Sequence, residues 1–271
     1  MTTHSATAQP ESRWRLGLDL GSTAAKAVLL APDGTMAGMR IDTSGIPPSE
    51  AADGLARGIL ADHGVGDGDE VAVVATGYGR SLAGSAGRKV TEITCHAKGV
   101  HHFHPDAAAI LDIGGQDAKA IRLGPGGSVE DFAMNDRCAA GTGCFLEVAA
   151  RRYSLDVGQL SEFCGASSAP GEGIEPFEIS STCVVFAESE LVGLNARGTP
   201  PVEALRAVHR AIARRVGLLL RRVDAAQPLY FAGGVAKNET LRRAIEEETG
   251  LEVRTARYPQ FTGALGAALF A

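Results

Sequence analysis

The chain carries the same short segment twice. The segments LDLGSTAAKAVLL, at 18–30, and LDIGGQDAKAIRL, at 111–123, align without a gap. Seven of the thirteen positions are identical, at a constant offset of 93 residues. These positions are Leu18/Leu111, Asp19/Asp112, Gly21/Gly114, Ala25/Ala118, Lys26/Lys119, Ala27/Ala120 and Leu30/Leu123. A match of this kind indicates two copies of one supersecondary unit, which restricts the chain to a duplicated architecture.

Each copy has the pattern of a β-hairpin whose first strand ends in an aspartate, Asp19 or Asp112. A glycine-rich turn and a second apolar strand follow. Glycine lets the backbone approach an anion closely, and backbone N–H groups with the Ser22 and Thr23 hydroxyls can bind phosphate oxygens. The aspartates can hold a hydrated Mg²⁺. Two such turns predict a site that clamps a nucleoside triphosphate from both sides; the alternative is two plain hairpin turns, where Asp and Gly are common.

In the rest of the chain, glycine-rich turns separate predicted strands and helices, as is typical of an α/β fold with two lobes. VAVVATGYGR, at 71–80, predicts a buried strand and a glycine-rich turn. The segment 229–250 predicts a strand, a Gly233-Gly234 turn and a helix closed by glycine. Those two glycines would let the flat ring or the ribose of a ligand approach the backbone closely. The alternative is that the turn needs glycine for packing alone. The segment 203–223 predicts a long amphipathic helix with a solvated arginine face, in which His209 packs or faces water.

Length and composition are those of an ordinary globular protein. The chain has 271 residues, of which 45% are hydrophobic and 21% charged, with a net charge of -6. This balance favours neither nucleic acid nor an anionic membrane as the main partner, and no apolar run is long enough to span a bilayer. The polar N-terminus has no signal-peptide pattern. We therefore expect a cytoplasmic protein with a disordered tail at 1–14, one lobe at 15–105 and a second at 106–271, whose last helix can pack back on the first lobe.

The five cysteines fall into two groups. An odd number in a chain of this size argues against a disulfide framework. Cys95 and Cys164 have the context of buried, reduced thiols. Cys138 and Cys183 differ, because each lies just ahead of a helical pattern, 45 positions apart.

Four motifs carry a resemblance to a known family. They are DLGSTAAK (19–26), DIGGQD (112–117), NDRCAAGTG (135–143) and SSTCVVFAESE (180–190), and TGYGR and the ending YPQFTGALGAALFA support them. The chain resembles the activators of 2-hydroxyacyl-CoA dehydratases, a family that includes the ATPase subunits of benzoyl-CoA reductase, over nearly its whole length after residue 15. The resemblance implies an α/β fold of two ribonuclease H-like lobes, as in the actin, sugar-kinase and Hsp70 ATPases, with an ATP cleft between them.

The resemblance also implies cofactors and partners. Such proteins bind ATP with Mg²⁺, and one [4Fe–4S] cluster is shared across a homodimer or a pair of homologous subunits. Each subunit gives two thiolates, which on this chain match Cys138 and Cys183. ATP hydrolysis drives an electron at low potential into an acyl-CoA dehydratase or reductase, and a ferredoxin or flavodoxin is the implied donor. No nucleic acid and no membrane is implied.

The same matching assigns roles to individual residues. Asp19 and Asp112 are the Mg²⁺ candidates, and Gln116 and Asp117 match positions near the γ-phosphate and the attacking water. The expected nucleotide-binding residues are Gly21, Ser22, Thr23, Ala24, Ala25 and Lys26 of the first turn, Gly114, Gly115, Gln116 and Asp117 of the second, and Gly233, Gly234 and Gln260. Hydrolysis would rest on positioning and charge stabilisation, without a covalent intermediate.

Elementary chemistry agrees with the cysteine assignment. A [4Fe–4S] cluster takes four thiolates, so two per chain suffice in a two-fold dimer. A helix N-terminus points its positive end at an anionic cluster and lowers the pKa of a nearby thiol. Cys144 stands where the family more often has a basic residue; it is either a competing ligand or a helix-core thiol. The loop at 165–176 is long for a dehydratase activator, which leaves the partner open.

Three alternatives remain at this point. The chain could be a permanent subunit of a benzoyl-CoA reductase complex. It could be a small-molecule kinase of the same fold, such as one acting on an N-acetylhexosamine, which would have no use for Cys138 and Cys183. It could also be a nucleotide-binding regulator without catalysis.

Overall fold

The computed structural model describes residues 13–43, 45–135, 139–166, 177–179 and 184–271. They form two compact units. The first reaches up to Cys95 and includes Gly263–Ala271, and the second is His96–Thr262. The division falls inside α2 (Glu92–Phe103) and after the first residue of α8 (Thr262–Ala268). From the sequence alone, we expected this boundary between 105 and 106, after the whole of α2.

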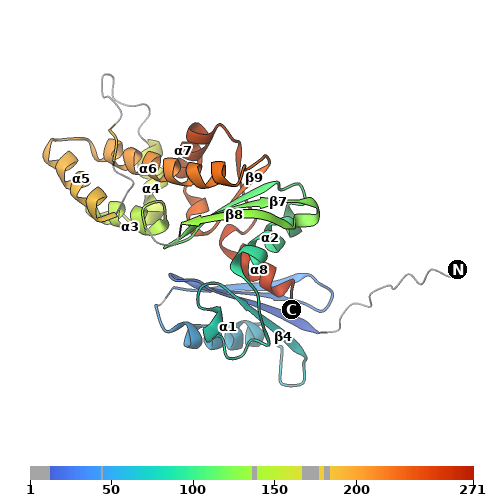
Figure 1. Ribbon diagram of the computed structural model, residues 1–271. Helices are drawn as coiled ribbons and strands as arrows, with labels where there is room; N and C mark the ends of the chain where they lie inside the picture. The colour runs from blue at the N-terminus through green and yellow to red at the C-terminus, as the bar shows by residue number, and fades with distance from the viewer. Residues whose placement is uncertain (1–12, 44, 136–138, 167–176, 180–183) are drawn as a thin grey trace. The chain divides into compact units, whose positions relative to one another are not determined.

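The first unit is a five-stranded mixed sheet with α1 on one face (Figure 1). The strand order is β3-β2-β1-β4-β5; β1, β2 and β3 are antiparallel, and β4 and β5 continue the sheet in parallel. The elements are β1 (Trp14–Leu20), β2 (Ala25–Leu30), β3 (Met36–Asp42), α1 (Pro48–Asp62), β4 (Val71–Thr76), η1 (Arg80–Leu82) and β5 (Arg88–Lys89). Leu16, Leu18 and Leu20 alternate along β1, as one face of a strand requires, and share a core with Leu55 and Ile59 of α1.

The second unit repeats this sheet. Its strand order is β8-β7-β6-β9-β10, again with three antiparallel strands followed by two parallel ones. The strands are β6 (Ala109–Ile113), β7 (Ala118–Leu123), β8 (Val129–Asn135), β9 (Leu229–Ala232) and β10 (Val253–Thr255). Even a bulge recurs, between Leu29 and Leu30 in β2 and between Arg122 and Leu123 in β7. The internal repeat seen in the sequence is therefore a repeat of the whole sheet.

Helices α6 (Pro201–Arg222) and α7 (Glu239–Thr249) lie along one face of the second sheet (Figure 1). The second unit also contains α3 (Gly143–Arg152), α4 (Leu160–Ala166) and α5 (Val184–Ala196), with short turns η2 (Pro125–Gly127), η3 (Val157–Gln159), η4 (Gly234–Lys237) and η5 (Pro259–Phe261). Leu205, Val208, Ile212 and Val216 recur along α6 at helical spacing and pack in one core with Phe231 of β9.

The structure confirms the element predictions. Both hairpins form, β4 and β9 are strands, and the long helix at 203–223 is α6. Gly250 ends α7 in the left-handed conformation, with φ of 70°. Of the predicted tail at 1–14, residues 1–12 lie outside the described residues, and Trp14 is the first residue of β1. In the part of the chain that the structure describes, no helix is long and apolar enough to cross a membrane.

Candidate functional site

The first hairpin turn is closed by a hydrogen bond from the Gly21 amide to the Ala24 carbonyl, at 3.1 Å. The Ser22 and Thr23 side chains are exposed. Asp19 lies directly across the hairpin from Lys26, and Lys26 Nζ is 3.7 Å from Asp19 Oδ2. Asp19 is buried, yet its Oδ1 has no hydrogen-bond partner among the described residues. A buried carboxylate oxygen left unpaired fits a hydrated Mg²⁺.

The second turn is closed in the same way, by the Gly114 amide and the Asp117 carbonyl at 2.9 Å. A Cβ on Gly114 would lie 2.7 Å from Asp117 Oδ1, so a larger residue there would displace the Asp117 side chain. Asp112 is buried and lies across from Lys119. Gln116 is exposed and Asp117 is half-buried, as a group that meets a ligand should be.

Two residues to which the sequence assigned no role in the site surround Asp112. Lys119 Nζ lies 3.2 Å from Asp112 Oδ2 and 2.8 Å from Asp117 Oδ2. His96 Nε2 lies 3.6 Å from the same Asp112 oxygen, and His96 Nδ1 is 2.9 Å from Thr262 Oγ1. The identity Lys26/Lys119 in the repeat was the available signal for the lysine. Nothing local in the sequence marks His96.

A third turn, which contains Gly233 and Gly234, lies at the end of β6. Gly233, with φ of 87°, donates its amide to the Pro259 carbonyl at 2.8 Å. A Cβ there would stand 2.2 Å from the Ile113 carbonyl oxygen, so glycine is required for this approach. Gln260 Nε2 lies 3.5 Å from where a Cβ on Gly234 would be. The second unit thus brings together Asp112, the second turn, both glycines and Gln260, as the sequence predicts for one ligand.

The second turn is also bonded to the start of α3. The Gly143 amide donates to the Gly114 carbonyl at 2.9 Å, and the Cys144 amide donates to the Gly115 carbonyl at 2.8 Å. The first N–H groups of a helix have no partner within the helix, so the turn supplies their acceptors. α3 begins at Gly143, the last residue of the NDRCAAGTG motif. The predicted phosphate turn and the helix after Cys138 are consequently one hydrogen-bonded structure.

The Gly233-Gly234 turn is followed by a buried polar pair. Asn238 begins α7 as its N-cap, accepting the Leu241 amide at 2.9 Å, and its Nδ2 lies 3.0 Å from His209 Nε2. His209 Nδ1 in turn lies 2.8 Å from the Leu205 carbonyl. Burial lowers the pKa of His209 to about 4. His209 is therefore a neutral packing residue, one of the two roles expected of it.

The described cysteines divide by environment. Burial raises the pKa of Cys95 to about 12 and that of Cys164 to about 11. Both are free cysteines in buried surroundings, which confirms the expectation of buried, reduced thiols. Cys144 is only half-buried, at the start of α3. The cluster candidates Cys138 and Cys183 lie outside the described residues; α5 begins at Val184, the next residue after Cys183.

Two duplicated sheets, each with an Asp-Gly hairpin turn, define the actin–sugar kinase–Hsp70 ATPase fold. A glucokinase of the ROK family from Streptomyces griseus shares this fold at 15% identity, with a TM-score of 0.54. Within the fold, the profile of the BadF/BadG/BcrA/BcrD ATPase family matches residues 16–271. The chain belongs to this family.

Relatives similar over nearly their full length include three with named activities. The (R)-2-hydroxyglutaryl-CoA dehydratase activating ATPase of Acidaminococcus fermentans is 39% identical over 96% of this chain and 97% of its own. A benzoyl-CoA reductase subunit of Thauera aromatica is 32% identical over 94% and 91%. The solved activator of 2-hydroxyisocaproyl-CoA dehydratase from Clostridium difficile, with bound ADPNP, is 37% identical over 95% and 94%, with a TM-score of 0.86.

Proposed function

We propose that this chain is an ATP-hydrolysing electron-transfer protein with a [4Fe–4S] cluster, which activates a 2-hydroxyacyl-CoA dehydratase. The observation that carries the proposal is the pair of hydrogen bonds from Gly143 and Cys144 to the second turn. They attach the helix that follows Cys138 to the turn expected to meet ATP. A change at the turn would therefore be passed through these hydrogen bonds to α3, the helix that follows Cys138 in the sequence.

The nucleotide part of the proposal rests on the two hairpin turns and the glycine turn. In this account the first turn, Gly21 to Lys26, and the second, Gly114 to Asp117, bind phosphate oxygens through backbone amides. Asp19 and Asp112 hold hydrated Mg²⁺, which would neutralise phosphate charge when bound. The half-buried Asp117 and exposed Gln116 orient the attacking water. Gly233, Gly234 and Gln260 contact the adenosine. The bound ADPNP of the solved relative supports nucleotide binding, and the individual residues are our proposal.

The redox part rests on cysteine chemistry. Cys138 and Cys183 of two chains would hold the cluster, which supplies a one-electron centre when bound. Supporting this, Cys95 and Cys164 are buried in the core of the described residues, whereas Cys138 and Cys183 each stand shortly before a helix in the sequence. The start of α5 beside Cys183 would favour the thiolate form.

The proposal includes a homodimer, and two exposed side chains of α5 support one. Large apolar side chains exposed on one helix are typical of a surface that a partner covers. Ala187, Leu191 and Leu194 of α5 are buried in the core, whereas Phe186 is 65% exposed and Val192 is 44% exposed. A second chain, paired by the cluster, would cover these side chains. A ferredoxin or flavodoxin is the proposed electron donor, in a cytoplasmic setting.

The alternative within the family is an ATPase subunit of a benzoyl-CoA reductase. The relatives at 37–39% identity with named activities are dehydratase activators, whereas the reductase subunit is 32% identical, so the activator is favoured. A sugar kinase shares only the fold.

An activation assay tests the proposal. Protein prepared without oxygen is mixed with ATP, Mg²⁺, a low-potential reductant and a 2-hydroxyacyl-CoA dehydratase, and substoichiometric amounts should switch the dehydratase on. ATP hydrolysis should fall about 100-fold or more in Asp112→Asn, since the proposed mechanism depends on charge placed at the phosphates. Hydrolysis that requires an added sugar, with no dehydratase activation, would show a kinase instead.

A further inference from the structure

The two hairpins place a lysine at the same position and give it different surroundings. In both, lysine lies directly across the hairpin from the aspartate: Asp19 pairs with Lys26 and Asp112 with Lys119. The aligned turns differ two positions before each lysine, where the first has Ala24 and the second has Asp117. The second turn therefore contains an extra carboxylate within reach of its lysine.

The two ammonium groups accordingly have different surroundings. Lys119 Nζ sits between two carboxylates, 3.2 Å from Asp112 Oδ2 and 2.8 Å from Asp117 Oδ2, and its side chain is 1% exposed. Lys26 Nζ is 3.7 Å from Asp19 Oδ2, and its side chain is 18% exposed. It also lies over its turn, 3.3 Å from where a Cβ on Gly21 would stand. Lys26 can reach a ligand at the turn, whereas Lys119 is enclosed.

A buried ammonium between two carboxylates fixes both of them. Each unpaired charge in such a place is costly, and two neighbouring carboxylates repel each other, so removing the lysine would force the side chains apart or toward protonation. His96 approaches the same Asp112 oxygen, at 3.6 Å, which holds that carboxylate from a second side. The orientation of Asp112 and Asp117 is thereby set before any ligand binds.

We infer that Lys119 is a positioning residue of the ATPase site: it holds Asp112 and Asp117 in their working arrangement, while its repeat counterpart Lys26 is the cation that meets phosphate. This inference rests on the proposed ATPase function and adds a division of labour between the two copies. Both turns contain the lysine, but only the second has Asp117 beside it. In the second turn the lysine therefore supports the carboxylates and does not bind the ligand.

Steady-state kinetics of ATP hydrolysis test the inference with matched variants. Lys119→Met should lower kcat about 100-fold, the usual cost of misplaced catalytic groups, and leave KM for ATP within about threefold. Lys119→Arg keeps the charge with altered reach and should recover about tenfold of that loss. Lys26→Met should instead raise KM at least about tenfold, because it removes a phosphate contact made in the ground state as well.

The outcomes separate this inference from the proposed function. If the wild-type chain does not hydrolyse ATP, the proposed function fails and the inference falls with it. If the wild type is active and Lys119→Met keeps kcat within about threefold, or raises KM as Lys26→Met does, the inference is overturned and the ATPase stands. Should Lys119→Met not fold, Lys119→Arg decides alone: a lowered kcat at unchanged KM supports positioning, and wild-type kinetics overturn it.

Discussion

Asn238 donates a hydrogen bond from Nδ2 to Nε2 of His209, with 3.0 Å between the two nitrogens. The direction is fixed, because Asn238 Oδ1 accepts the Leu241 amide and its amide nitrogen must therefore face the ring. His209 then donates from Nδ1 to the Leu205 carbonyl, at 2.8 Å. One neutral tautomer satisfies both bonds, and this pair joins α6 to the start of α7, directly after the Gly233-Gly234 turn.

The buried His209 predicts acid-sensitive stability. Burial lowers its pKa from 6.5 to about 4, so between these values the unfolded chain binds a proton that the folded chain does not. The free energy of unfolding should fall as the pH is lowered through this window, by about 3 kcal/mol in total. Denaturant unfolding of wild type and His209→Gln between pH 8 and pH 4 measures it. The variant should be less stable at pH 8, and its free energy of unfolding should depend less steeply on pH in this window.

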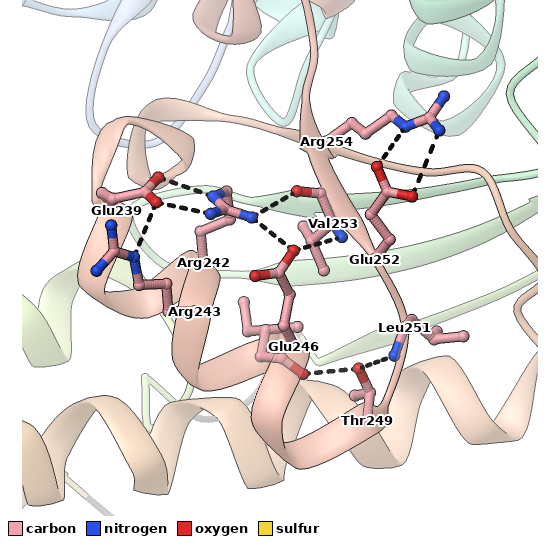
Figure 2. Close-up of polar contacts among 10 residues, drawn as sticks. Glu239, Arg242, Arg243, Glu246, Thr249, Leu251, Glu252, Val253 and Arg254 are labelled. Carbon is pink, nitrogen blue, oxygen red and sulfur yellow. Dashed lines mark hydrogen bonds and ion pairs between the residues drawn. The ribbon is translucent and has the colours of Figure 1, made fainter.

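Arg242 holds the start of α7 to the strand that follows the helix (Figure 2). It binds both oxygens of Glu239, at 2.6 and 2.7 Å, and donates from Nη1 to Glu246 and to the Val253 carbonyl. Arg242→Met should lower the free energy of unfolding by about 1–2 kcal/mol, a discounted value because Glu239 is partly exposed. Arg243→Met, in a more exposed arginine that contacts Glu239 alone, should stay within about 0.5 kcal/mol of wild type.

The same cluster predicts a second, more acidic pH effect. The hydrogen bond that Glu239 accepts from Arg242 is the main cause that lowers the pKa of Glu239 from 4.5 to about 2. Stability from this carboxylate is fully present above pH 4.5 and is lost as the pH falls toward 2. Arg242→Met should weaken that part of the acid transition, since Arg243 still donates to Glu239, and an unchanged transition in the variant would contradict the assignment.

Two close backbone contacts predict intolerance of a single methyl group in the first unit. A Cβ on Gly266 of α8 would stand 1.8 Å from the Cys95 carbonyl oxygen, and one on Gly17 would stand 2.0 Å from the Ala264 carbonyl oxygen. Gly266→Ala should cost about 3 kcal/mol of unfolding free energy, because backbone must move. Gly54→Ala in α1, where nothing lies within 4 Å, should be neutral or stabilising by up to about 1 kcal/mol. Equal melting temperatures for the two variants would refute the packing account.

The bond between the second turn and α3 predicts a variant that separates hydrolysis from activation. A Cβ on Gly143 would lie 3.1 Å from the Gly114 carbonyl oxygen and 3.2 Å from Val235 Cγ2. Gly143→Ala should therefore loosen the helix from the turn. We expect ATP hydrolysis within about threefold of wild type and dehydratase activation per ATP lowered about tenfold or more, since a small displacement is enough. Gly158→Ala, with open space around it, is the control. Parallel loss of both activities would argue against this coupling.

Much of the fold follows from local signals in the sequence. The repeat at an offset of 93 predicted the two hairpins, and the structure extends it to whole sheets with bulges at matching positions. Turn glycines marked the strand ends, and Gly250 marked the end of α7, because these positions need conformations that other residues resist. The boundary between the two units, inside α2, could not be predicted from the sequence. It depends on which unit each residue of the helix contacts, and no glycine, proline or change in composition marks it.

Asp112, Gly114, Gly233 and Gln260 lie near one another in the second unit, because each stands at a strand end or turn that the sequence marks. Their role in binding nucleotide stays a prediction. The roles of Lys119, His96 and Asn238 depend on partners that local sequence does not reveal. Lys119 looks identical to Lys26 in the aligned repeat, and only the distances to Asp117 and Asp112 distinguish them.

The iron and acid-labile sulfide content of protein purified without oxygen tests the central claim most directly. We predict about four irons for every two chains, since a [4Fe–4S] cluster takes four thiolates. The iron should be lost in Cys138→Ala and in Cys183→Ala, and retained in Cys144→Ala and Cys164→Ala. Absence of iron in strictly anaerobic protein that still hydrolyses ATP would contradict the electron-transfer account and leave an ATPase or kinase of the same fold.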